Sequence, residues 1–401
     1  MSLPPLTPEQ RVKPWRFELR LAVIYAAVFF PLGVHLPYFP VWLEAKGFDA
    51  GQIALILAAP MFLRVVTTPL IAALADRAPE RATMLVGAVA IAAILSLGYF
   101  LPADYATVLI VSLALAVTWS AQTPLTDSLA LSGVRRFGSN YPAMRIWGSI
   151  SFLAANFVGG ALIAWQGAGS VPAVIAAGLA VALLASLAAP RLGRPRIASP
   201  LSATDIHDKA PKLLRRSFLL FVAAAGMITA SHGFLYSFIS IYWASIGIGE
   251  TTVGLLWACG VTSEICLFMV FNRLFGRLSA HAVLMLAGCA ALLRWLVYPW
   301  IHPLGLGVPG FFAVQVLHAF SVGLILIGVQ KFIGETVAEH RNGAAQGIAF
   351  FANGLAMAAV TLVSGPIYQR FGPNGFYAMA VVVLLGLALA AAAMLSARRL
   401  K

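Results

Sequence analysis

The sequence predicts an all-α membrane protein of 12 transmembrane helices, arranged as two six-helix repeats with both termini in the cytoplasm. Three observations lead to this fold class. First, 61% of the 401 residues are hydrophobic and only 10% are charged, whereas about 25% of residues in soluble domains are charged. Second, apolar runs of about 20 residues recur along the whole chain, and each can cross a ~30 Å hydrocarbon layer as a helix. Third, two stretches that lie 200 residues apart resemble each other.

The apolar runs define the expected helices, and their polarity does not alternate as it does in transmembrane β-barrels. We expect spans over residues 18–43, 50–74, 82–101, 105–130, 142–165, 170–189, 217–245, 250–272, 281–300, 308–332, 343–366 and 374–397. The chain then divides into a cytoplasmic N-tail (1–17), a first six-helix bundle (18–189), a cytoplasmic linker (190–216), a second six-helix bundle (217–397) and a C-tail (398–401).

The basic residues set the expected orientation. The net charge is +13, and 23 of the 27 Lys and Arg residues fall in the two tails, in every second loop or at the adjoining span ends (Arg20, Arg145 and Lys331), while the intervening loops hold two. This asymmetry follows the positive-inside rule, so it indicates membrane topology with cytoplasmic termini rather than a nucleic-acid partner. The N-terminal segment has no small-residue cleavage site and is expected to stay uncleaved. We expect a multi-pass protein of the cell membrane, which in a bacterium is the inner membrane.

An internal repeat relates the two predicted bundles. The stretch Gly47-Phe-Asp-Ala-Gly-Gln-Ile-Ala-Leu aligns with Gly247-Ile-Gly-Glu-Thr-Thr-Val-Gly-Leu at an offset of 200 residues, and Trp42 and Trp243 precede them at almost the same distance. Two six-helix repeats in the same orientation, joined by an inner linker, resemble the parallel-repeat plan of the major facilitator transporters.

The inner loop after the second span carries a further likeness. It reads Ala72-Ala-Leu-Ala-Asp76-Arg77-Ala-Pro-Glu-Arg81 and is similar to the major facilitator pattern Gly-x-x-x-Asp-Arg-x-Gly-Arg-Arg. Asp76, Arg77 and Arg81 match that pattern, while both glycines and one basic residue are replaced. The resemblance implies a gate in which ion pairs at helix ends break and re-form. The alternative is a solvated turn.

An acid and an arginine occur where apolar helices would bury them. Glu264 lies inside the span 250–272, and the 200-residue offset places Arg64 at the corresponding position of the span 50–74. A charge at mid-membrane costs roughly 2.5–3.5 kcal/mol, so each requires a partner or a function. Either these charges form static ion pairs, with each other or locally, or they take part in transport.

Three more ionisable residues lie near the ends of predicted spans. Asp127 comes late in the fourth span and Arg145 early in the fifth, so a short inner loop between antiparallel helices would bring the two together. The alternative is that both are interfacial and that Arg145 extends to the membrane surface. Arg294, in the outer half of the ninth span, is either a partner for Glu264 or a residue that reaches the outer surface.

Polar and aromatic side chains share faces of several predicted helices. His232 and Tyr236 are four residues apart, and Gln315 and His318 are three apart, so each pair shares a helix face. Histidine can hold or lose a proton near neutral pH, although a lone buried histidine also serves as a hydrogen-bonded core residue. The other candidates are Gln346 and Asn353, on one stripe of the eleventh span, and Phe152 and Trp257, which either stack on a ring or simply pack.

Several of these motifs, in this order, resemble the phenylpropionate permease family of the major facilitator superfamily over nearly the whole chain. They are Thr123-Pro-Leu-Thr-Asp127, Arg145-Ile-Trp-Gly-Ser149, Ser231-His232, Ile241-Tyr-Trp243, Gly254-x-x-Trp257 with Glu264, Asn272-Arg-Leu-Phe275, Leu293-Arg294-Trp295 and Gln315-Val-Leu-His318. The chain is more distantly similar to lactose permease, a sugar:proton symporter. That likeness falls on Asp127, Arg145 and Glu264, while Phe152 replaces a stacking tryptophan.

The resemblance implies import of a small aromatic monocarboxylate together with a proton, at a site between the two halves. It implies that Glu264 is the main proton carrier, with Asp127 and His318 as further proton-coupling groups. Arg145 is the first candidate for the substrate carboxylate, because a guanidinium fork matches a carboxylate in two hydrogen bonds. The remaining candidate substrate-binding residues are Arg64, Arg294, His232, Tyr236, Gln315, Phe152, Trp257, Gln346 and Asn353.

The sequence contains no nucleotide-binding loop, nucleophile elbow or zinc motif. We therefore expect no enzyme activity, no metal and no cofactor, and a proton gradient as the energy source. The expected partners of a monomeric protein are a small-molecule substrate, a proton and the lipid bilayer. The alternatives with the same fold are a sugar or nucleoside proton symporter and a proton-driven drug efflux antiporter. The alternative from a different class is a membrane enzyme or a transporter-derived sensor.

Overall fold

The computed structural model of the chain describes residues 12–193, 214–337 and 341–398, and over these residues its regular secondary structure consists of helices. This confirms the predicted all-α class for the described part of the chain. The first 11 residues of the predicted N-tail, most of the predicted linker and the last three residues lie outside the described residues.

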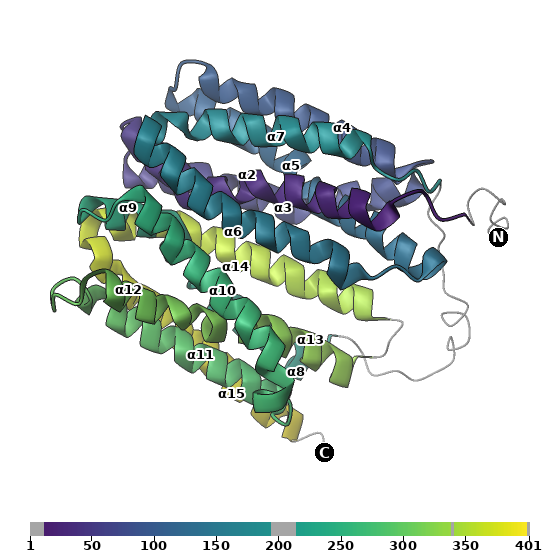
Figure 1. Cartoon of the computed structure of the whole chain (residues 1–401). Helices are drawn as coiled ribbons and strands as arrows, with labels where there is room; N and C mark the ends of the chain where they lie inside the picture. The colour runs from purple at the N-terminus through teal and green to yellow at the C-terminus, as the bar shows by residue number, and fades with distance from the viewer. Residues whose placement is uncertain (1–11, 194–213, 338–340, 399–401) are drawn as a thin grey trace. The chain divides into compact units, whose positions relative to one another are not determined.

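Eleven stretches of the described residues are long and apolar enough to cross a membrane (Figure 1). The last of them, Ala344–Ala397, is 54 residues long and contains two helices, because the short turn Gly372–Gly375 separates α14 from α15. The prediction of a multi-pass helical membrane protein is therefore confirmed. The number of 12 spans and the cytoplasmic position of both termini stay predictions.

The chain divides into two compact units. The first unit holds α2 (Phe17–Ala45), the later part of α3 (Ala50–Arg77), α4 (Arg81–Ser96), α5 (Tyr105–Phe137), α6 (Tyr141–Gln166) and α7 (Val171–Leu187). Within it, α2 packs against α6 and α7. Gly33 of α2 allows this close approach, because a Cβ atom there would lie 2.6 Å from the carbonyl oxygen of Phe152. The predicted ring-stacking residue thus contributes its backbone to helix packing.

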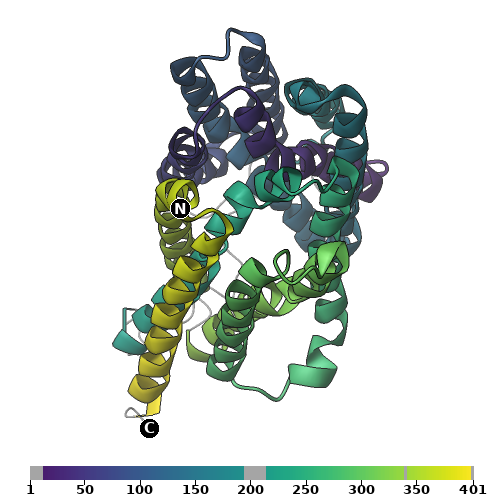
Figure 2. The same ribbon diagram turned by 90° about the vertical axis from the view of Figure 1, so that its left-hand side faces the viewer.

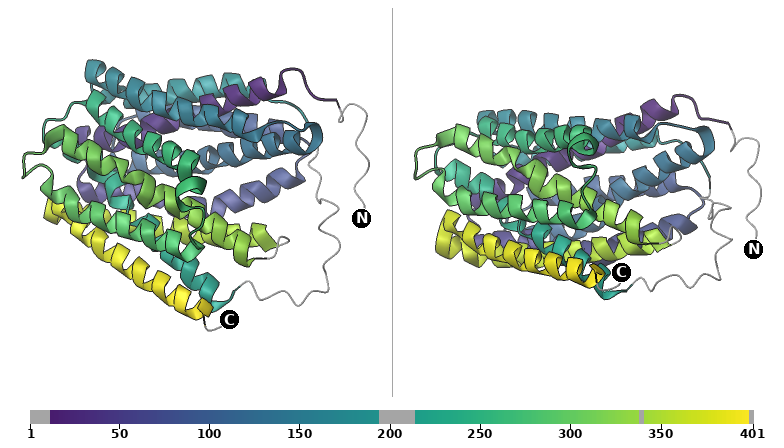
Figure 3. Two further views of the ribbon diagram at one scale, coloured as in Figure 1. Left: turned by 60° about the horizontal axis from the view of Figure 1, so that its bottom comes forward. Right: turned by 90° about the horizontal axis from the view of Figure 1, so that it is seen from below.

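The second unit holds residues 47–62 and the helices after the linker. These are α8 (Arg216–Ala230), α9 (Gly233–Ser245), α10 (Glu250–Phe275), α11 (Ala280–Val297), α12 (Gly307–Val316), the π-helical turn η5 (Ala319–Gly323), α13 (Leu324–Thr336), α14 (Asn342–Phe371) and α15 (Phe376–Arg398). Within this unit α15 packs along α8 (Figure 2) and beside α11 (Figure 3).

Two predicted spans of the second unit are interrupted in the structure. The span 217–245 breaks between α8 and α9 at Ser231 and His232, and the span 308–332 breaks between α12 and η5 at Leu317 and His318. Each interruption therefore falls at a buried histidine. A π-helical turn inside a helix is rare and often marks a functional site.

The predicted internal repeat reappears in the backbone. Gly47 and Gly247 adopt almost the same left-handed conformation, with φ of 86° and 84°, which a glycine adopts without steric cost. The next helices, α3 and α10, each begin three residues later, at Ala50 and Glu250. The sequence offset of 200 residues therefore corresponds to the same turn in both halves of the chain.

The inner loop after α3 has a structure that the motif did not indicate. Glu80 caps the start of α4 by accepting a hydrogen bond from the backbone N–H of Ala82 at 3.1 Å, and it accepts a second one from Gly193 at 2.7 Å. Arg81 donates to α5, at 3.4 Å from the Ser128 carbonyl oxygen. The side chains of the predicted gate residues Asp76 and Arg77 lie outside the described part of the structure, so the gate stays a prediction.

Candidate functional site

A buried arginine organises the polar interior of the second unit. Arg294 of α11 has no exposed surface, yet its guanidinium meets acceptors from three directions. It donates through Nη2 to Gln315 Oε1 at 2.8 Å and through Nη1 to Ser321 Oγ at 2.8 Å, and Nη1 lies 3.4 Å from His318 Nδ1. A fully buried side chain cannot reach the outer surface, so the predicted alternative of a surface arginine is wrong.

The acid of this cluster is Glu264 of α10. Its Oε2 atom lies 3.8 Å from Nε2 of His318. Among the described residues, no ion pair within 4 Å joins Glu264 to Arg294, and His318 stands between them. The predicted pairing of the two charges is therefore indirect, through the imidazole ring.

Two glycines make room for this arrangement. A Cβ atom at Gly260 of α10 would lie 3.4 Å from the His318 ring, and a Cβ atom at Gly323 of η5 would lie 3.2 Å from Cγ of Glu264. Because neither position carries a side chain, the His318 ring lies directly against α10 and the Glu264 side chain lies directly against η5.

Gln315 of α12 holds the opposite side of the guanidinium. Its Oε1 atom accepts from Arg294 and also from the Tyr298 hydroxyl at 3.3 Å, while its Nε2 donates to the Leu256 carbonyl at 3.1 Å. The predicted face shared by Gln315 and His318 is confirmed, since both side chains contact Arg294.

His232 lies at the interruption between α8 and α9. Its Nε2 atom is 3.0 Å from Ser321 Oγ, and its Nδ1 atom is 3.1 Å from the Thr229 carbonyl oxygen. The indole of Trp295 packs edge-on against its ring, with 4.8 Å between the ring centroids. Ser321 thereby joins His232 to the arginine cluster.

Two aromatic rings line the edge of the cluster. The half-buried Tyr236 ring lies 6.0 Å from His232, 6.5 Å from His318 and 5.9 Å from Trp257, measured between ring centroids. Trp257 donates from Nε1 to Ser240 Oγ at 2.9 Å. The predicted candidates Tyr236 and Trp257 therefore lie together, and Tyr236 lies beside both histidines.

The first unit contains a second polar group of residues. Asp127 of α5 accepts hydrogen bonds on Oδ1 from the hydroxyls of Tyr25, at 2.6 Å, and Tyr141, at 3.0 Å. Arg145 of α6 lies over the ring of Phe29 at 4.1 Å and over that of Tyr25 at 5.5 Å. Asp127 and Arg145 thus meet at the same tyrosine, but within the described residues no ion pair joins them.

Cation–π contacts of this kind are worth about 0.5–2 kcal/mol and leave guanidinium N–H groups available. Gly148 provides space for the group, since a Cβ atom there would lie 2.9 Å from Arg145 Nη1. Arg145 is partly exposed, in contrast to Arg294. Of these two arginines, Arg145 is thus the accessible one, and among the described residues its guanidinium contacts aromatic rings and no acid or amide group.

The other predicted site residues are not in contact with either group in the described structure. Gln346 exchanges two hydrogen bonds with Gln330, at 2.9 and 3.2 Å. The buried Oδ1 atom of Asn353 has no hydrogen-bond partner among the described residues. Arg64 is exposed on α3 and lies close enough to His35 to act on it electrostatically.

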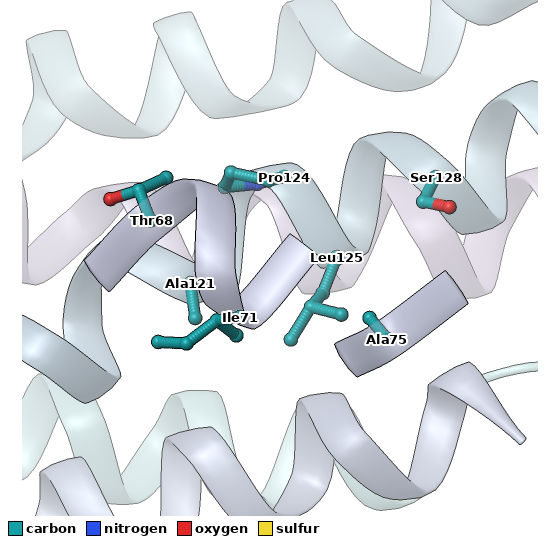
Figure 4. Close-up of a pocket in the computed structure, with 7 residues that line it drawn as sticks. All are labelled: Thr68, Ile71, Ala75, Ala121, Pro124, Leu125 and Ser128. Atoms are coloured by element: carbon teal, nitrogen blue, oxygen red, sulfur yellow. The ribbon is translucent and has the colours of Figure 1, made fainter. Parts of the chain in front are cut away.

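A pocket of the first unit lies between α3 and α5 (Figure 4). It is lined by Thr68, Ile71, Ala75, Ala121, Pro124, Leu125 and Ser128. Most of these side chains are apolar, and none is a predicted site residue.

Sequence reasoning missed four residues that hold the two groups together: Ser321, Tyr298, Tyr25 and Tyr141. Ser321 follows His318 by three residues, as His318 follows Gln315, so continuing the polar stripe would have found it. Tyr298 follows Arg294 by four residues on the same helix face. Tyr141 precedes Arg145 by four residues and carries the same signal. Tyr25 carries no such signal, because it comes from a helix other than those of Asp127 and Arg145.

Known proteins resemble this chain in sequence along most of its length. The sequence profile of the MFS_1 like family matches residues 18–379. The chain belongs to this family. Among curated proteins, this member of the MFS_1 like family is 28% identical to a probable 3-phenylpropionic acid transporter of Escherichia coli (strain K12) over 91% of the chain and 94% of the relative. It is also 28% identical to a maltose permease of Geobacillus stearothermophilus, over 88% and 89%.

Solved structures show the same fold for this MFS_1 like protein. The nucleoside transporter NupG superposes with a TM-score of 0.77 at 18% identity and covers 95% of this chain and 99% of its own. A bacterial homologue of the lysosomal transporter Spinster superposes with a TM-score of 0.71 at 16% identity, covering 96% and 98%. The protein is therefore a multi-pass membrane transporter of the major facilitator superfamily, and its relatives are transporters rather than enzymes.

Proposed function

We propose that the protein is a proton-coupled symporter of the bacterial inner membrane that imports a small aromatic monocarboxylate by alternating access. The observation that carries this proposal is the contact series from Glu264 through His318 to Arg294, inside helices of a transporter. An acid, an imidazole and a guanidinium in contact provide a group that can hold a proton and neighbours whose positions control it.

Glu264 is the proton carrier in this proposal. Burial favours the neutral form of a carboxyl group, and an approaching cation favours the charged form. In the structure the arginine faces the histidine rather than the acid, an arrangement compatible with a proton on Glu264. Movement of the Arg294 guanidinium toward Glu264, or protonation of the His318 ring, would place a positive charge beside the acid and release that proton.

Arg145 is the proposed receptor for the substrate carboxylate. Nη1 and Nη2 of Arg294 already meet an amide, a hydroxyl and an imidazole, whereas Arg145 contacts only ring faces among the described residues and is partly exposed. The same rings, Phe29 and Tyr25, offer apolar faces beside the guanidinium. A carboxylate next to an aromatic ring is the substrate that this pairing fits, and the name of the Escherichia coli relative supports the same class.

Uptake into proteoliposomes with an imposed pH gradient tests the proposal. We expect accumulation of labelled 3-phenylpropionate that depends on the gradient. Glu264→Gln should abolish accumulation but retain exchange of labelled for unlabelled substrate, since exchange requires no net proton release. Full gradient-driven accumulation by this variant would contradict the role of Glu264.

The second candidate function is a sugar or nucleoside proton symporter. The maltose permease relative and the fold shared with NupG favour it. Competition of 3-phenylpropionate uptake by maltose and by uridine, measured in the same vesicles, separates the two. Accumulation of the sugar or the nucleoside, without accumulation of the aromatic acid, would replace the first proposal by the second.

A further inference from the structure

The contacts around Arg294 fix where the protons of two buried histidines lie. A guanidinium carries only donors, so the nitrogen of His318 that faces Arg294 Nη1 at 3.4 Å must be an acceptor. That nitrogen is Nδ1. The proton of the neutral ring is therefore on Nε2, the atom that lies 3.8 Å from the carboxylate oxygen of Glu264.

His232 has the opposite arrangement. A carbonyl oxygen only accepts, so Nδ1 of His232, which lies 3.1 Å from the Thr229 carbonyl, carries the proton. Its Nε2 atom then accepts, and the partner at 3.0 Å is the Ser321 hydroxyl, which must donate to it. The Ser321 oxygen in turn accepts from Arg294 Nη1 at 2.8 Å.

A doubly protonated His232 does not fit this site. The ring is fully buried, and its only link through Ser321 leads to another cation, Arg294. A second buried positive charge without an acid beside it would be costly. The hydrogen bonds thus run in one direction, from Arg294 to Ser321, from Ser321 to His232, and from His232 to the backbone.

We propose that Ser321 is a positioning residue for proton coupling: its hydroxyl holds the Arg294 guanidinium against Nδ1 of His318 and so directs the Nε2–H group of His318 toward Glu264. Its effect on coupling rests on the proposed function, whereas the proton positions rest on the contacts alone. His232 supports Ser321 by accepting its proton and is not itself a substrate ligand in this scheme.

The position of Ser321 gives this role a structural basis. Ser321 has no exposed surface and lies in the π-helical turn η5, which begins at the residue after His318. The charged and titratable groups that face Glu264 and His318 are Arg294 of α11, Tyr236 of α9 and His232 at the start of α9. Of these groups only Arg294 is a permanent cation, so its distance from Glu264 decides the protonation of the acid.

Uptake of 3-phenylpropionate against pH tests the role of Ser321. In Ser321→Ala the guanidinium loses one acceptor and can turn toward Glu264, which favours the charged carboxylate. We expect the pH dependence of uptake to move by roughly one unit or more toward acid. Ser321→Thr keeps the hydroxyl and should restore the profile of the unaltered protein. The matched control is Ser364→Ala, which removes a fully buried hydroxyl that donates within its own helix at 2.7 Å.

A profile of Ser321→Ala that coincides with that of the unaltered protein would overturn the coupling role, as would an equal shift in Ser364→Ala. Nitrogen-15 chemical shifts of the two histidines, measured by solid-state NMR on the unaltered protein in liposomes, test the proton positions without transport. We expect Nδ1–H for His232 and Nε2–H for His318. The same tautomer at both rings would overturn the inference even where Ser321→Ala does not fold.

The two measurements also separate this inference from the proposed function. In one outcome, uptake by the unaltered protein does not depend on the pH gradient, but the two histidines have opposite tautomers and Ser321→Ala changes the tautomer of His318. The proposed symport then fails, while Ser321 keeps its positioning role. If uptake follows the gradient but the tautomers are equal, symport stands and the role of Ser321 is lost.

Discussion

Replacing the neutral Gln315 should destabilise the protein more than replacing the charged Arg294. In Gln315→Leu, Nη2 of Arg294 and the Tyr298 hydroxyl lose the acceptor that they share, and the Leu256 carbonyl inside α10 loses one of its donors. An unsatisfied buried group costs about 1–3 kcal/mol, and more when it is charged. Because such losses in one network are not additive, we expect a total of about 3–5 kcal/mol.

Arg294→Met should cost much less, within about 2 kcal/mol. Gln315 keeps Tyr298 as a donor, and Ser321 keeps its bond to His232, so only His318 Nδ1 is left without a donor. The variant also removes a buried charge, and replacing buried charges by apolar groups of similar size is often neutral or stabilising.

Thermal unfolding of the purified variants, followed by intrinsic fluorescence, measures the difference. At roughly 2–4 °C per kcal/mol, Gln315→Leu should lower Tm by about 6–15 °C and Arg294→Met by only a few degrees. Gln330→Leu, which removes an exposed glutamine that pairs with Gln346, is the control and should change Tm little. A larger fall in Tm for Arg294→Met than for Gln315→Leu would show that the loss of these hydrogen bonds does not determine stability.

Two further predictions concern the first unit. Gly33→Ala should destabilise the protein by roughly 1–3 kcal/mol, because the added Cβ atom would lie 2.6 Å from the Phe152 carbonyl oxygen. The control is Gly87→Ala on α4, where nothing lies within 4 Å of the added atom, and this variant should leave Tm unchanged or raise it. A Tm scan of the pair checks this, and equal effects would contradict the close packing of α2 on α6. Arg145→Lys should raise the KM for 3-phenylpropionate about tenfold or more while Tm stays nearly constant, because lysine cannot bind a carboxylate in two parallel hydrogen bonds. An unchanged KM would remove Arg145 from the carboxylate site.

The sequence predicted the helical class and the internal repeat well, because both depend on local signals. Apolar length indicates a span whatever lies beside it, and Gly47 and Gly247 mark a turn that needs a left-handed residue. The interruptions at His232 and His318 were not predicted, because the flanking segments are apolar enough to be one helix. Such breaks depend on contacts with other helices.

The second-unit site was predicted as a set of residues but not as a network. Glu264, Arg294 and His318 are unusual in apolar segments and could be identified singly. Their connections could not, because they depend on the rotation of α10, α11 and α12 about their axes. Ser321, a common residue in membrane helices, is distinguished only by the two side chains that it joins.

The predicted contact between Asp127 and Arg145 likewise depended on contacts between helices that the sequence does not indicate. Chain order correctly brought the end of α5 near the start of α6, but the structure places tyrosines beside both charges. Tyr25 comes from α2, more than 100 residues away in sequence from Asp127. No counting along one loop would have included it.

Part of the polar interior is bounded by main-chain atoms rather than by side chains. The carbonyl oxygens of Thr229 and Leu256 accept hydrogen bonds from His232 and Gln315, and every residue type at positions 229 and 256 would supply the same oxygen. Random mutation at those positions therefore leaves these two acceptors in place as long as the helix geometry is kept. A library directed at new substrates can vary positions 229 and 256 without removing these acceptors, provided that the fully buried site of Leu256 stays filled, whereas variation at Ser321 or Gln315 would change the direction of the hydrogen bonds.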